Sequence, residues 1–155
     1  MIPSEVEIRK INIAQSKELS DLLLQSDREY SKYFIPFEFD IVSVSKVLEK
    51  AVKDMYYGIY VNSILVGFYM LRGWDAGYGV PSYGVWIAEN FSSKGLSKLT
   101  LHHAISICRI NKVKKLMLKV HPDNIIAKKI YEDFGFTFSG VDEKIGHLIY
   151  YKNIK

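Results

Sequence analysis

A short stretch near the middle of the chain combines an apolar strand, a polar turn and the start of a helix. Residues 83–88 are mostly apolar, residues 92–97 are Ser-Ser-Lys-Gly-Leu-Ser, and a helical pattern begins at Leu96. The first N–H groups of a helix lack partners within the helix, and the helix dipole places partial positive charge there. Small residues in the turn let the backbone approach a ligand closely. The stretch therefore predicts a site for an anion, such as the phosphates of a cofactor.

The hydrophobic pattern predicts the elements that must position this turn. Alternation and β-rich composition predict strands at about 5–11, 55–61, 64–71, 82–88, 115–120, 136–142 and 145–152, with Asn62-Ser63 as a hairpin turn. Helical periodicity predicts four helices, at about 14–26, 40–51, 95–110 and 124–135. Asp40 is the expected N-cap of the second, and Gly135 is expected to end the fourth. The order β-α-α-β-β-β-α-β-α-β-β predicts one mixed α/β domain over residues 1–155.

Two of these helices carry apolar faces that we expect to be buried. In the helix over 95–110 the predicted face consists of Leu96, Leu99, His103, Ala104 and Ile107. In the helix after Asn124 it consists of Ile126, Ala127, Ile130, Tyr131 and Phe134.

An aromatic segment with no clean period lies between the first two helices. It holds Tyr30, Tyr33, Phe34, Phe37 and Phe39. Such aromatics either plug the edge of a core or wall a binding cleft, and both can hold for one segment.

Composition excludes several classes of protein. The 155 residues are 48% hydrophobic and 25% charged, which favours a folded domain. The net charge of +4 invites a nucleic-acid partner, but the lysines are spread along the chain, so we expect a generally basic surface and no nucleic acid. The lone Cys108 allows no internal disulfide, and no His, Cys and Asp spacing suggests a metal. With no secretory signal and no apolar run long enough for a bilayer, we expect a cytoplasmic protein without a membrane partner.

Two segments resemble the GNAT N-acetyltransferase superfamily. Residues 92–97 are similar to its acyl-CoA pyrophosphate loop, in which a Gln or Arg is followed at fixed spacing by glycine and a second small residue. Residues 118–136 are similar to its second half, with Asn124, Ala127, Tyr131 and Gly135-Phe136 at the expected offsets. Ser92 replaces the usual long side chain, which removes one cofactor contact, and Ser97 replaces the second small glycine. Most donors in such a loop are main-chain groups, so we still expect binding.

The resemblance implies a central, mostly antiparallel sheet flanked by helices, and acetyl-CoA as cofactor. It implies that the strand before the loop splays from its neighbour and that main-chain groups of Val85, Trp86 and Ile87 hold the pantetheine arm. The residues expected at the cofactor's phosphates are Ser92, Ser93, Lys94, Gly95, Leu96, Ser97 and Lys98, while Asn124 caps a helix and also contacts the cofactor.

The resemblance also implies catalytic roles. Tyr131 is the candidate general acid that returns a proton to the departing thiolate; the alternative is that it only packs. Tyr83 lies at a strand position where the family often carries a group that relays the amine's proton, although an ordinary tyrosine is a poor base and a water chain is an alternative. The residues that could line the mouth for the acceptor are Asp75, Tyr78, Tyr83 and His121.

Together these features predict an N-acetyltransferase that moves an acetyl group from acetyl-CoA to a primary amine of a small molecule, such as an amino sugar, polyamine or antibiotic. No nucleophile motif supports a covalent intermediate, so we expect direct attack in a ternary complex. The alternatives are acetylation of a protein N-terminus or lysine, and a non-catalytic module that binds coenzyme A. We expect a monomer or a homodimer.

Overall fold

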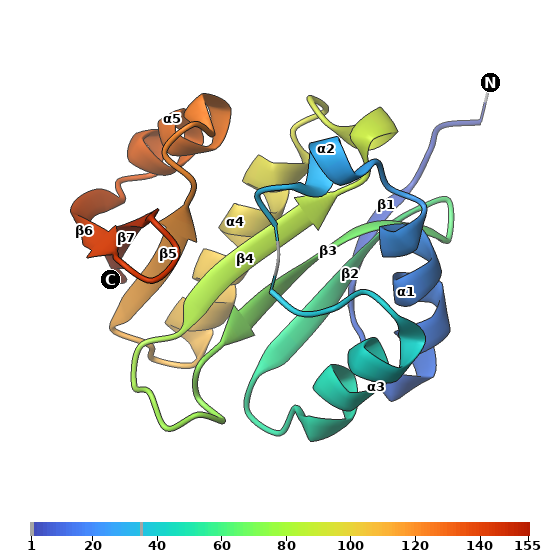
Figure 1. Cartoon of the computed structure of the whole chain (residues 1–155), viewed down its shortest axis with the longest axis horizontal. Helices are drawn as coiled ribbons and strands as arrows, with labels where there is room; N and C mark the ends of the chain where they lie inside the picture. Colours follow the sequence, from blue (N-terminus) through green and yellow to red (C-terminus); the bar gives the residue numbers. More distant parts are fainter. Residues whose placement is uncertain (1, 35) are drawn as a thin grey trace.

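One seven-stranded sheet runs through the molecule, which is described by a computed structural model over residues 2–34 and 36–155. The strand order is β1-β2-β3-β4-β5-β7-β6, and every neighbouring pair is antiparallel except β4 and β5 (Figure 1). The strands are β1 (Val6–Lys10), β2 (Met55–Val61), β3 (Ile64–Arg72), β4 (Ser82–Ile87), β5 (Lys115–Val120), β6 (Thr137–Asp142) and β7 (His147–Asn153). The predicted mixed, mostly antiparallel sheet is thus confirmed.

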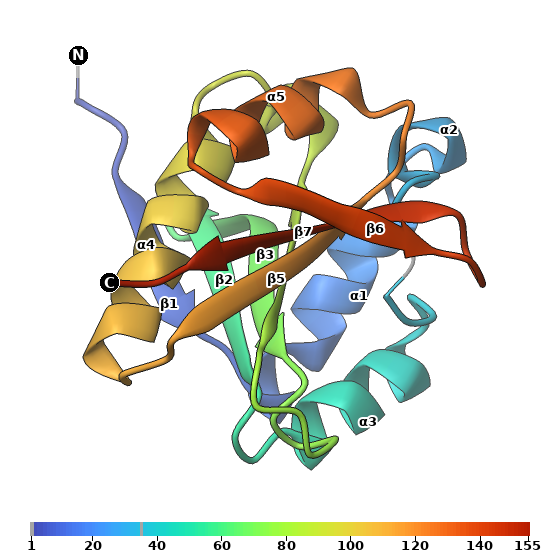
Figure 2. The ribbon, with the colours of Figure 1, turned by 90° about the vertical axis from the view of Figure 1, so that its left-hand side faces the viewer.

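Helices cover both faces of the sheet. They are α1 (Ser16–Leu24), α2 (Arg28–Ser31), α3 (Ile41–Lys50), α4 (Leu96–Ile110) and α5 (Ile125–Asp133), with single 3₁₀ turns at Ile13–Gln15 and Glu89–Phe91. Helices α1 and α3 pack on one face and α4 on the other, so the sheet is the middle layer (Figure 2). The element order agrees with the prediction, to which the structure adds the short helix α2. No helix in the described part of the chain is long and apolar enough to cross a membrane.

Local sequence explains several boundaries. Asn62 and Ser63 both adopt positive φ, the geometry of a tight hairpin turn between β2 and β3. The side chain of Asp40 accepts a hydrogen bond from the Ser43 N–H at 3.1 Å and so caps α3, as predicted. Gly135 has φ of 88°, which ends α5 in the left-handed conformation that glycine tolerates.

Two details of the predicted buried faces are wrong. In α4 the residues packed on the sheet are Leu101, Ala104, Ile105 and Cys108, whereas Leu99 is 44% exposed. Leu99 is only two positions from Leu101 and therefore points away from the sheet. In α5, Ile126 is 77% exposed, because this helix covers the sheet near β5 and β7 with a narrower face.

Candidate active site

Strands β4 and β5 form a fork. They pair in parallel only at Ser82–Met117 and Tyr83–Leu118, after which they diverge (Figure 1). The Ala88 N–H bonds to the Val66 carbonyl on the β3 side, so alternation turns the main-chain groups of Val85 and Ile87 toward the fork. The edge of β4 therefore offers peptide donors and acceptors to a ligand lying between the strands.

The turn at the open end of the fork leads directly into α4. Ser93 and Gly95 both adopt left-handed backbone, with φ of 60° and 82°. Gly95 occupies the N-cap position of α4, and no side chain caps this helix. The first N–H groups of α4, on Leu96, Ser97 and Lys98, precede the first intrahelical bond, from Leu99 to Gly95. A Cβ built on Gly95 would meet nothing within 4 Å, so space is open beside these donors.

A cleft of about 460 Å³ joins the fork, the turn and one face of α5. The predicted site residues that line it are Tyr83, Val85, Trp86, Ile87, Ser92, Ser93, Gly95, Leu96, Ser97, Lys98, His121, Asn124 and Tyr131. Lys94 is not among them and is exposed. The cleft therefore gathers two segments, residues 83–98 and 119–131, that lie far apart in the sequence.

Tyr131 projects from α5 into this cleft. Its ring meets Tyr83 and Phe136 edge-on, at centroid distances of 6.4 and 6.0 Å. Burial raises the pKa of Tyr131 to about 12, so the phenol keeps its proton at neutral pH. Among the described residues, none receives a hydrogen bond from its hydroxyl. The position suits a proton donor.

Tyr83 is more deeply enclosed than the sequence suggested. It is 3% exposed, and its hydroxyl lies 2.9 Å from Oγ1 of Thr100 on α4. Burial raises the pKa of Tyr83 well above its usual value of 10. A phenol held in its neutral form is a poor proton acceptor, which argues against the relay role.

His121 stands where β5 ends and also lines the cleft. Its Nδ1 accepts a hydrogen bond from the Asp123 N–H at 3.1 Å, so the neutral ring carries its hydrogen on Nε2. Tyr33 stacks on this ring at a centroid distance of 4.1 Å. In this arrangement the His121 ring forms a wall of the cleft, and its only free nitrogen is a donor.

Residues 28–34, here called the strap, cross the fork from one strand to the other. On the β4 side, the Tyr30 hydroxyl donates to the Ile87 carbonyl at 2.5 Å, and Nε1 of Trp86 donates to Oγ of Ser31 at 3.1 Å. On the β5 side, Tyr33 stacks on His121. The strap thus closes one end of the cleft with aromatic side chains, and the described lining residues include no Asp or Glu.

Comparison with known families decides which enzyme class has this cleft. The model of the acetyltransferase (GNAT) family matches residues 18–136. The chain belongs to this family. It is an acyl-CoA-dependent N-acetyltransferase, and acetyl-CoA is its cofactor, as the sequence predicted.

Relatives of this acetyltransferase include enzymes that act on polyamines. Over 117 residues it is 34% identical to the spermine/spermidine N(1)-acetyltransferase of Bacillus subtilis (strain 168), a match that covers 64% of this chain and 72% of the relative. The PaiA N-acetyltransferase of Thermoplasma acidophilum, solved with coenzyme A, has a TM-score of 0.77 at 21% identity over 96% of this chain and 99% of that one. The microcin C7 self-immunity acetyltransferase MccE, solved with acetyl-CoA and AMP, has a TM-score of 0.79 at 22% identity, over 97% and 93% of the two chains.

The features of this acetyltransferase fit its cofactor. The uncapped start of α4 offers N–H donors to a pyrophosphate, and the splayed edge of β4, where the Ile87 carbonyl accepts from Tyr30, offers amide partners to a pantetheine arm. Both features are main-chain, so Ser92 in place of a longer side chain leaves them intact. Oγ of Ser92 donates to the Glu89 carbonyl at 2.6 Å and thereby braces the turn.

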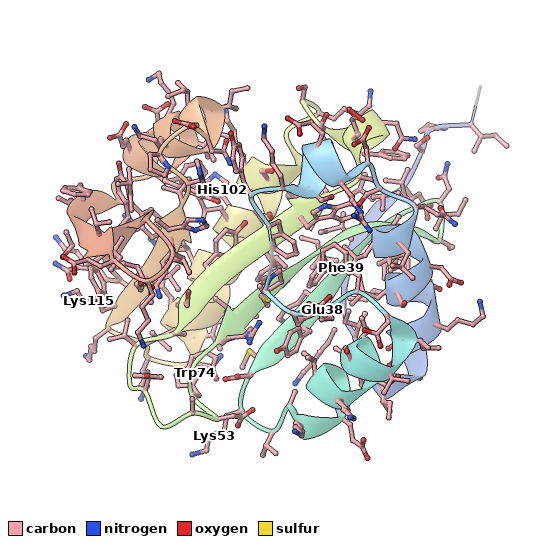
Figure 3. The ribbon with its side chains drawn as sticks, viewed as in Figure 1. Glu38, Phe39, Lys53, Trp74, His102 and Lys115 are labelled. Atoms are coloured by element: carbon pink, nitrogen blue, oxygen red, sulfur yellow. The ribbon has the colours of Figure 1, made fainter. Side chains whose placement is uncertain are left out.

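Asp75 and Tyr78 do not reach this cleft, and their predicted role in lining it is wrong. They lie in the connection that precedes β4, whereas the fork opens where β4 ends. The Asp75 carboxylate instead accepts hydrogen bonds from the N–H groups of Val52, Lys53 and Asp54. Figure 3 shows the neighbouring Trp74 beside Lys53, at the end of the molecule away from α5. Tyr78 is 69% exposed.

The cleft also has lining residues outside the predicted site, which are Tyr30, Tyr33, Phe34, Gly84, Phe91, Lys119, Val120, Ile126, Ala127 and Ile130. The first three come from the aromatic segment, for which both proposed roles hold. Tyr30, Tyr33 and Phe34 line the cleft, and Tyr30 and Phe34 also pack, with Phe37 and Phe39, on the core between the sheet and the helices α1 and α3. Ile126, on the exposed side of α5, lines the cleft as well. Only the density of aromatics in residues 30–39 signalled the first three.

Proposed function

We propose that this enzyme transfers the acetyl group of acetyl-CoA to a primary amine of a small molecule, by direct attack in a ternary complex. The observation that carries the proposal is the fork between β4 and β5, with uncapped α4 at its open end and Tyr131 on its flank. This arrangement provides a place for two substrates side by side and a proton donor next to them.

The main chain holds the cofactor in this proposal. The N–H groups of Ser93 to Lys98 bind the pyrophosphate, with Ser92 and Ser97 hydroxyls close by. Val85 and Ile87 bind the pantetheine arm along the edge of β4 and direct a donor at the acyl oxygen, beside Trp86. Asn124 contacts the arm from the start of α5. Because backbone groups do most of this, the side chains of the loop are free to differ from the family pattern.

Tyr131 is the proposed general acid. Acetyl-CoA supplies an acetyl thioester, which is activated toward attack by an amine. Tyr131, which lines the cleft, donates its hydroxyl proton to the sulfur as the C–S bond breaks. Burial keeps the phenol protonated, and the same burial makes a thiolate a stronger base than it is in water.

The amine must lose a proton before it attacks. Tyr83 cannot take it readily, since its phenol is neutral and enclosed, and the free nitrogen of His121 is a donor. We therefore assign this step to water that enters the cleft.

The acceptor is a small amine in this proposal because a polyamine acetyltransferase of Bacillus subtilis is 34% identical to this chain over 117 residues. The strap encloses the acceptor end with Tyr30, Tyr33 and Phe34. Aromatic faces attract an ammonium group as it approaches and also pack against aliphatic or sugar carbons. An enclosed aromatic end suits a compact amine better than an extended peptide.

The test is thiol release from acetyl-CoA across a panel of amines. The panel holds spermidine, an amino sugar, an aminoglycoside, a peptide with a free N-terminus and an N-blocked lysine peptide, each with mass analysis of the product. We expect turnover with at least one small amine at a kcat/KM at least about tenfold above both peptides. Preference for a peptide would overturn the small-molecule assignment, while Tyr131→Phe distinguishes enzymatic transfer from slow chemical acetylation.

A further inference from the structure

A buried hydrogen-bonded chain connects the fork to the start of α4. The Tyr83 hydroxyl lies 2.9 Å from Oγ1 of Thr100, and Oγ1 of Thr100 donates to the Ser97 carbonyl, also at 2.9 Å. Tyr83 and Thr100 are 3% and 0% exposed. The hydroxyl hydrogen of Thr100 is used on Ser97, so the hydrogen between the two side chains belongs to Tyr83. Tyr83 is the donor and Thr100 the acceptor.

The residues at the two ends of this hydrogen-bonded series, Tyr83 and Ser97, each lie next to a part of the cleft. Tyr83 is the last residue of β4 that pairs with β5, so it marks the point where the fork opens. Ser97 lies in the first turn of α4, among the N–H groups that face the cleft. The two hydrogen bonds therefore link the main-chain surfaces of β4 and α4 that, in the proposed function, bind one cofactor molecule together.

We propose that Tyr83 is a positioning residue, which acts through Thr100 to hold the first turn of α4 in register with the splayed edge of β4. Without it, the pyrophosphate donors and the arm-binding edge shift relative to each other, and a ligand that spans both loses contacts. This inference rests on the proposed cofactor site and takes the place of the relay role predicted for Tyr83.

The same face of the sheet supplies a matched control. Tyr69 on β3 is also fully buried, and its hydroxyl bonds to Nδ1 of His103, farther along α4. Its ring lies 5.7 Å from that of Tyr83. Tyr69→Phe therefore removes a part-buried hydrogen bond between sheet and helix, at a place that does not line the cleft. A general loss of stability would affect both variants alike.

The experiment measures the binding of coenzyme A by calorimetry, and the KM for acetyl-CoA with the best amine. We expect Tyr83→Phe to weaken binding and raise this KM about fivefold, with kcat at saturation within about twofold, which is the signature of lost binding without lost chemistry. We expect Tyr69→Phe to leave both constants unchanged. Thr100→Val should behave like Tyr83→Phe, and Thr100→Ser, which keeps the hydroxyl, should restore wild-type binding. Because Tyr83→Phe and Thr100→Val remove the same hydrogen bond, the double variant should bind coenzyme A only slightly more weakly than either single variant.

Three results would overturn the inference. If Tyr83→Phe and the wild type have the same affinity for coenzyme A and the same KM for acetyl-CoA, Tyr83 only packs in the core. A fall in kcat with unchanged affinity for coenzyme A would show that Tyr83 takes part in the chemical step. Equal weakening by Tyr69→Phe would make the effect one of general stability. Should Tyr83→Phe not fold, Thr100→Val against Thr100→Ser makes the same comparison. Affinity for coenzyme A needs no acceptor, so failure of the whole amine panel would refute the proposed function and leave this test intact.

Discussion

The two helices that border the cleft begin in opposite ways. Helix α4 starts at Gly95 without a side-chain cap, whereas α5 starts at Asn124, whose Oδ1 accepts a hydrogen bond from the Ala127 N–H at 3.3 Å. Helix α3, outside the cleft, is capped in the same way by Asp40. A cap satisfies the donors that an anion would otherwise use. In the proposed function this difference has a purpose, because α4 binds the cofactor with its backbone, while α5 takes part in the reaction with a side chain, Tyr131.

The largest effect is expected when α4 is given a side-chain cap, because the cap would remove the difference between the two helices. Gly95→Asp places a carboxylate where the open donors are, and it repels the phosphates that should bind there. We expect the affinity for coenzyme A to fall by at least about 300-fold in a calorimetric titration.

Gly77→Asp is the matched control for this substitution. Gly77 also has positive φ, 91° against 82° for Gly95, and a Cβ there meets nothing within 4 Å. It lies in the connection before β4, away from the cleft, so the strain is similar and the affinity should stay close to wild type. If both variants bind coenzyme A equally well, the start of α4 is not the phosphate site.

The corresponding change on α5 is Tyr131→Phe, which removes only the hydroxyl. We expect kcat to fall about 100-fold while the affinity for coenzyme A stays within about twofold, because the ring keeps its packing against Phe136. Burial raises the pKa of this phenol to about 12, so the protonated form persists far above neutral pH. The wild-type kcat should therefore show no loss from this group between about pH 7 and 9. Unchanged turnover in the variant would exclude Tyr131 as the acid.

Sequence reasoning succeeded where the signal was local. The turn at 92–97, the motif from Asn124 to Phe136 and the hairpin at Asn62-Ser63 each lie within one short window, and each is where the pattern placed it. Contacts between distant segments could not be predicted in this way. Tyr30 and Ile87 are 57 residues apart, and only the fold shows that they meet.

One error was avoidable from chain direction alone. Residues 73–81 precede β4 and residues 88–95 follow it, so they must lie at opposite ends of that strand. Asp75 and Tyr78, in residues 73–81, therefore lie at the end of β4 away from the phosphate turn and cannot line the cleft beside it. The hydrogen bond between Tyr83 and Thr100 is a different case, because it joins a strand to a helix 17 residues further along the chain and no local pattern signals it.

The smallest expected effect concerns the cap of α5. Asn124→Ala removes the hydrogen bond to the Ala127 N–H and should lower the free energy of unfolding by about 1 kcal/mol, or Tm by about 3 °C for a chain of this length. In the proposed function the amide also contacts the cofactor, so the affinity for coenzyme A should fall about threefold as well.

Asp40→Ala on α3 separates these two roles of Asn124, since it removes a similar cap at a distance from the cleft. It should lower Tm by a similar amount and leave the affinity for coenzyme A unchanged. If Asn124→Ala likewise lowers Tm but not affinity, Asn124 acts as a cap only. Asn124 would then serve the helix alone, and Tyr131 would be the residue through which α5 serves the reaction in the proposed function.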